Sequence, residues 1–180
     1  MTWLFLPILI VIVVAAYLAA RRLARKRGEG HNPHSRPGQH GAYALIWTAV
    51  PALVVLLGVA VFSAPMERSL TLAGAPEAVQ QLEPLRREAF FADARNVGAG
   101  QPTAQIWPAP YAELLPVEGQ RAKRIGQTIG LGGGVGALLA AMLGGLFVFS
   151  QIRPAMRARN RVEGWIIGAL FVCSAVAVLT

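Results

Sequence analysis

The hydrophobic positions of this 180-residue chain gather into four long runs instead of alternating with polar ones. The runs cover residues 3–20, 42–64, 125–152 and 164–180, none of them contains a charged residue, and the second is interrupted only by Pro51. A helix needs about 20 mostly apolar residues to cross a bilayer, and such a helix tolerates a proline. No alternation typical of strands accompanies these runs. The pattern therefore predicts an all-α, polytopic membrane protein with four transmembrane helices.

Composition and charge support this class. Hydrophobic residues make up 54% of the chain and charged residues 14%, against about 25% charged in soluble chains. The net charge of +8 would suit nucleic acid, but the basic clusters adjoin apolar runs, which points to membrane lipid and to topology instead. We therefore expect no nucleic-acid partner. Cys173 lies within an apolar run, where a free cysteine usually acts as a small apolar filler.

The basic residues predict the orientation. They concentrate in two short loops: Arg21, Arg22, Arg25, Lys26, Arg27 and Arg36 follow the first run, and Arg153, Arg157, Arg159 and Arg161 follow the third. Residues 65–124 hold seven basic and seven acidic residues and are neutral. The positive-inside rule places both basic loops in the cytoplasm, with their arginines near lipid headgroups, and the neutral segment outside. Both termini then lie on the periplasmic side of a bacterial inner membrane. Because the positive charge follows the first run, this run is expected to be a retained anchor.

These spans imply three regions. Residues 1–64 form a membrane hairpin with a basic cytoplasmic loop, residues 65–124 form a partly helical periplasmic segment, and residues 125–180 form a second hairpin. Within the outer segment we expect a helix from Pro76 to about Arg95, with Val79, Leu82, Ala89 and Phe90 on its less polar side, bent or broken at Pro84.

Two pairs of side chains in the outer segment have alternative interpretations. Trp107 and Tyr111 could mark contact with the membrane interface or pack onto the helix of their own segment, which we favour. Glu83 and Glu88 could suggest an acid–base pair, but Arg86 and Arg87 neutralise this stretch. A solvated helix face is the simpler interpretation, so we expect no catalytic residue here.

All three histidines, His31, His34 and His40, lie in the first basic loop among prolines and glycines. Neutral imidazoles suit zinc, copper or nickel, so one hypothesis is that these histidines form a metal site. A closed zinc site needs four fixed ligands, and Glu29 is the one acidic residue nearby. We favour a polar loop and expect neither a metal nor a cofactor.

The third run carries the clearest local motif. Gly126, Gly130 and Gly134 repeat every four residues, and so do Gly132, Gly136 and Ala140. Small residues at this spacing allow two membrane helices to approach closely. A nucleotide-binding glycine loop is the alternative, but no Lys–Ser/Thr pair follows. We expect these glycines to serve helix packing.

Two loop sequences resemble a known family. The residues HSRPGQHG at 34–41, after an anchor ending in Arg21–Arg22, and the run RARNRVE at 157–163, leading into residues 166–180, resemble the N-terminal region of a bacterial phosphate ABC transporter permease subunit of the PstC type. The resemblance covers the full chain. It implies further permease subunits, an ATPase subunit and a periplasmic phosphate-binding protein as partners. No phosphate-coordinating residue can be carried over from the family.

Such permeases continue through several more spans and a coupling loop, whereas this sequence ends 17 residues into the fourth run. The chain is therefore expected to be an N-terminal part, either truncated, frameshifted or made as a separate piece, that is not competent for transport alone. The alternative is a small membrane scaffold or regulatory subunit, favoured by the lack of charged residues within the runs, since intramembrane charges usually mark a transport route. A membrane enzyme is third, because no set of polar residues converges at one place.

Overall fold

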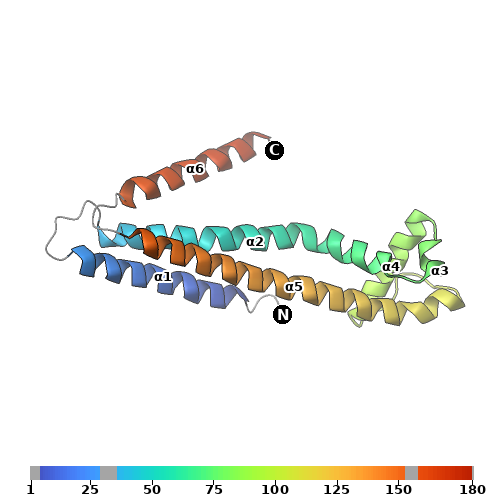
Figure 1. Ribbon diagram of the computed structural model, residues 1–180. Coiled ribbons are helices and arrows are strands. Elements are labelled where there is room, and N and C mark those ends of the chain that lie inside the picture. The colour runs from blue at the N-terminus through green and yellow to red at the C-terminus, as the bar shows by residue number, and fades with distance from the viewer. Residues whose placement is uncertain (1–4, 29–35, 153–157, 180) are drawn as a thin grey trace. The chain divides into compact units, whose positions relative to one another are not determined.

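The computed structural model describes residues 5–28, 36–152 and 158–179, which form helices and short connections (Figure 1). The helices are α1 (Phe5–Gly28), α2 (Pro37–Ala73), α3 (Glu77–Gln80), α4 (Pro84–Gly98), α5 (Ala109–Gln151) and α6 (Ala158–Leu179). Their contacts divide the chain into two compact units. One is built from residues 56–134, and the other from residues 3–55 and 135–180.

Among the described residues, three helices are long and apolar enough to cross a membrane: Phe5–Arg27, Pro37–Ala73 and Ala109–Gln151. The described parts of the first three predicted runs lie within these helices to within one residue, which confirms an all-helical, multi-pass chain over the described residues. The fourth run lies in α6, and its crossing of the membrane stays a prediction. α2 continues without a break through Pro51 and nine residues beyond the predicted span, to Ala73.

In the second unit, here called the hairpin unit, α1, α2, α5 and α6 meet at one end. Their core is formed by alanine, branched aliphatic and aromatic side chains: Ala20, Tyr43, Ala44, Val148, Ile152 and Ala158. α5 lies antiparallel to α2 here, because a Cβ at Gly144 would lie 2.9 Å from the carbonyl carbon of Trp47, whereas Gly136 faces Val55 further along. Glycine therefore permits the close approach of the two backbones.

In the first unit, here called the outer unit, α3 and α4 pack against the end of α2 and the start of α5. The predicted break at Pro84 is confirmed, since α3 ends at Gln80 and Pro84 is the first residue of α4. A proline suits this position because the first helical N–H has no partner within the helix. Val79, Phe90 and Leu115 form the core of the unit, with Leu82 and Trp107 packed against it.

Candidate functional site

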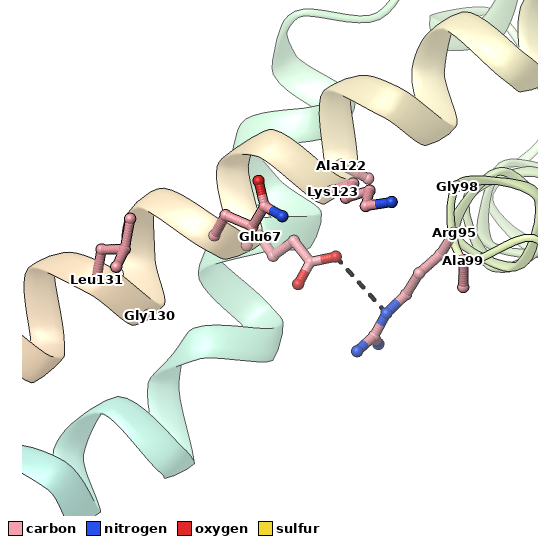
Figure 2. Close-up of a pocket in the computed structure, with 10 residues that line it drawn as sticks. Glu67, Arg95, Gly98, Ala99, Ala122, Lys123, Gly130 and Leu131 are labelled. Atoms are coloured by element: carbon pink, nitrogen blue, oxygen red, sulfur yellow. Dashed lines mark ion pairs between the residues drawn. The ribbon is translucent and has the colours of Figure 1, made fainter. Parts of the chain in front are cut away.

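The outer unit contains a charged cleft between α2, α4 and α5. The cleft has a volume of about 610 Å³ and is lined by Glu67, Arg95, Gly98, Ala99, Ala122, Lys123, Gly126, Gln127, Gly130 and Leu131. Figure 2 shows the Glu67 carboxylate and the Arg95 guanidinium pointing toward one another. Each of the three helices contributes one charged group, so the cleft exists only when α4 is docked on α2 and α5.

Two ion pairs join α2 to α4. Glu67 lies 3.6 Å from Arg95, and the neighbouring Arg68 pairs with Glu88. The Glu67 side chain is only 13% exposed, whereas that of Arg95 is 58% exposed. Ion pairs with at least one exposed partner contribute about 0–1 kcal/mol each, so they orient α4 more than they stabilise it. Glu88, considered above as part of an acid–base pair, is thus engaged by Arg68.

The crossing of α4 over α5 depends on a second pair of small residues. A Cβ on Gly98 would lie 2.8 Å from the carbonyl carbon of Gly119, and a Cβ on Gly119 would lie 2.8 Å from the backbone nitrogen of Gly98. The two backbones are therefore in direct contact. This pair is not predicted from the sequence, although Ala94 and Gly98 show the four-residue spacing of small residues that indicates close helix packing.

Asp93 on α4 anchors the irregular chain that follows. Its carboxylate is 1% exposed and accepts hydrogen bonds from the backbone N–H groups of Ala104 (2.7 Å) and Gln105 (3.3 Å) and from the indole N–H of Trp107 (2.8 Å). Burial alone would raise the pKa of Asp93, but the three donors outweigh it and hold the pKa below its ordinary value. This carboxylate therefore stays charged and fixes residues 104–107 against α4.

The Asp93 anchor also decides between the two interpretations of the aromatic pair. The Trp107 ring lies 5.4 Å from the ring of Phe90 in an edge-on arrangement, and Tyr111 lies 6.1 Å from Trp107. The favoured interpretation, packing on the helix of their own segment, is confirmed.

The glycines predicted for helix packing take different positions along α5. Gly126 faces Glu67 of α2, Gly130 lines the charged cleft, and Gly134 is buried. Gly136 faces Val55 at 3.7 Å, whereas a Cβ on Gly132 would meet no other described atom within 4 Å. Gly126 and Gly136 thus support packing within the chain, and a role for these glycines in assembly with other subunits stays a prediction.

The structure brings the two basic clusters to one end of the hairpin unit. Arg21, Arg22, Arg25, Lys26 and Arg27 occupy the last turns of α1, and Arg159 and Arg161 the first turn of α6. Arg27 donates to the carbonyl oxygen of Ile152 at the end of α5, and Arg161 donates to the Tyr43 hydroxyl of α2 at 3.2 Å. Arg153 and Arg157 lie outside the described residues.

Of the three histidines, only His40 is described; His31 and His34 lie outside the described residues. His40 is buried in the first turn of α2, and its Nδ1 has no hydrogen-bond partner among the residues that the structure describes. Within that part of the chain, no three metal-ligating side chains gather. The metal hypothesis, which needs all three histidines, stays untested.

Comparison with known proteins gives a family match over nearly the whole chain. Residues 6–180 match the model of the DUF3708 family, described as a phosphate ATP-binding cassette transporter. No curated protein and no solved structure matches the chain.

Proposed function

Because the chain belongs to the DUF3708 family of phosphate ATP-binding cassette transporters, we propose that it is the N-terminal part of a PstC-type permease subunit in a bacterial inner membrane. On this proposal the chain takes part in phosphate import but is not competent for transport alone. Its partners would be the remaining permease subunits, an ATPase subunit and a periplasmic phosphate-binding protein. The family match over residues 6–180 is the observation that carries the proposal, and it indicates a transporter-associated protein and no catalytic family.

The proposed topology places four helices in the membrane and residues 65–124 in the periplasm. Support comes from the hairpin unit, where the Arg27–Ile152 and Arg161–Tyr43 contacts bring both basic clusters to the same end. The positive-inside rule assigns that end to the cytoplasm. A cysteine introduced at Gln101 in a Cys173→Ser background should then react with an impermeant maleimide in intact spheroplasts. Reaction only after lysis would mean that this residue lies in the cytoplasm and that the proposed topology is wrong.

We propose that the charged cleft is a polar contact surface of the outer unit. Arg95 and Lys123 give its rim a positive excess over the single carboxylate of Glu67. Charged groups at the rim of an interface steer association and set specificity more than they add affinity. The cleft therefore suits a partner with an acidic surface, such as another component of the transporter.

Phosphate uptake tests the proposed function. The codons for residues 6–180 are removed from the chromosome, and uptake of radiolabelled phosphate is compared with uptake of sulfate as a control cargo. We expect high-affinity phosphate uptake to fall while sulfate uptake is unchanged, and re-expression of the full-length gene to restore it. Unchanged phosphate uptake would reject a transport role.

A scaffold or regulatory subunit is the second candidate. The observation in its favour is that residues 3–20, 42–64, 125–152 and 164–180 contain no Asp, Glu, Lys or Arg. Membrane segments that line an ion or substrate route usually carry such residues. The uptake experiment separates the two candidates, because a scaffold outside the transport system leaves phosphate uptake intact.

A further inference from the structure

The hairpin unit contains an apolar groove between α2 and α6. Its volume is about 740 Å³, and it is lined by Tyr43 and Val50 of α2 and by one face of α6 that runs from Arg161 to Cys173. Apart from the Arg161 guanidinium and the Tyr43 hydroxyl at one end, its lining is almost entirely apolar. The groove is thus an amphipathic site with one polar end and one long apolar body.

The polar end carries an uncompensated positive charge. Arg161 donates to the Tyr43 hydroxyl at 3.2 Å, and its guanidinium lies 5.7 Å from the centre of the Tyr43 ring. None of the described residues that line the groove is acidic, and the neighbouring Glu163 is paired with Arg159. A guanidinium fork binds phosphate oxygens through two parallel hydrogen bonds. The charge at this end therefore complements a phosphate group.

The apolar body has the length of one membrane leaflet. The thirteen residues from Arg161 to Cys173 span about 18 Å of helix, and one leaflet contributes about 15 Å of hydrocarbon. Gly164 and Gly168 make the α6 wall shallow, because a Cβ on either would meet no other described atom within 4 Å. A space of this shape accommodates an acyl chain.

We propose that this groove binds one anionic phospholipid, with its phosphate on Arg161 and the Tyr43 hydroxyl and an acyl chain along Gly164 and Gly168. The inference goes beyond the proposed role in phosphate import and does not depend on it. The basic loops predict only a general contact with lipid headgroups, whereas this groove is a defined binding site for one lipid. Under the proposed topology the polar end faces the cytoplasmic leaflet, where anionic lipids concentrate and basic pockets between helices bind their headgroups.

Native mass spectrometry of the purified full chain tests the proposal. The protein is titrated in detergent with phosphatidylglycerol and, separately, with phosphatidylcholine, and the first bound lipid is quantified. We expect one phosphatidylglycerol to bind at least about tenfold more tightly than phosphatidylcholine. Arg161→Gln should weaken the binding of phosphatidylglycerol about tenfold or more, the change expected from one lost charge-assisted hydrogen bond. Gly168→Leu should weaken the binding of both lipids, because its side chain fills the apolar body.

Two control variants match these changes. Arg25→Gln removes an exposed charge from the same basic end, and Gly132→Leu fills another open glycine position, on α5; neither residue lines the groove. Both should bind phosphatidylglycerol as the native chain does, and circular dichroism confirms that every variant is folded.

Three results would overturn the proposal. Equal binding of the two lipids would mean ordinary boundary lipid only. Unchanged binding in both Arg161→Gln and Gly168→Leu would place the lipid elsewhere. Loss of a co-purifying membrane protein in Gly168→Leu, with lipid binding intact, would mean that a partner helix fills the groove.

Discussion

Replacing Asp93 with asparagine should loosen residues 104–107 while leaving the helices in place. The carboxylate accepts three N–H donors with its two oxygens, whereas an amide has only one oxygen. In either orientation of the amide, at least one donor loses its acceptor and the negative charge is gone. A buried donor without an acceptor costs about 1–3 kcal/mol, and a hydrogen bond to a charged group contributes about 1.5–3 kcal/mol. We therefore expect the local opening free energy to fall by about 2 kcal/mol, which is a factor of about 30.

Amide hydrogen exchange measures this opening directly. The purified chain is exchanged in detergent at neutral pH, and the peptides that cover residues 101–108 are followed by mass spectrometry. The amides of Ala104 and Gln105 should exchange about 30-fold faster in Asp93→Asn, because exchange follows the local opening equilibrium. Glu113→Gln, which removes an exposed carboxylate in the first turns of α5, should leave these rates unchanged. Equal rates in native chain and Asp93→Asn would refute the anchoring role of Asp93.

Three further predictions concern the two units. The pKa of Asp93 is lowered in the folded chain. The stability that its carboxylate contributes is therefore present above its unfolded pKa of about 3.9 and is lost as the pH falls through the lower folded pKa. Acid titration monitored by amide hydrogen exchange should show this loss in the native chain and not in Asp93→Asn. Gly119→Leu should detach α4 from α5, because the leucine side chain meets the backbone of Gly98. Limited proteolysis should then cut within residues 84–98. Protection from proteolysis equal to that of the native chain would contradict the crossing of α4 over α5. Gly133→Leu should lower the melting temperature, since a Cβ there would lie 3.0 Å from Cγ1 of Val59 and overpacking costs about 1–3 kcal/mol. The control Gly132→Leu should change the free energy of unfolding by less than about 0.5 kcal/mol. Equal melting temperatures for the two variants would contradict the packing of α5 on α2.

The hydrophobic pattern predicts α1, α2 and α5, the candidate membrane helices among the described residues, because each contains an uncharged run about long enough to cross a bilayer. It does not predict where these helices end. α2 extends through the charged pair Glu67–Arg68 to Ala73, and α5 begins at Ala109, sixteen residues before the predicted span. The Glu67–Arg95 pair and the contact of Gly98 with Gly119 join these extensions to α4, and the local apolar pattern carries no information about such contacts.

In the outer unit, too, some features are predictable from the sequence and others are not. The break at Pro84 is predictable because proline cannot donate an N–H within a helix, and the packing of Trp107 follows from its need for apolar contact and an acceptor. The role of Asp93 is not predictable, because its donors lie 11 to 14 residues further along an irregular chain. The contact of Gly98 with Gly119 likewise joins two helices whose crossing no local pattern specifies.

Purification of the complex tests the central claim, that this chain is part of a phosphate importer, most directly. A tag at the amino terminus is added to the chromosomal copy, and native membranes from cells grown at limiting phosphate are solubilised and analysed by quantitative mass spectrometry. We expect an ATP-binding cassette ATPase and a second permease subunit to co-purify in stoichiometric amounts with the tagged chain. Recovery of the tagged chain without either subunit, under conditions that keep the ATPase and permease together, would contradict the account.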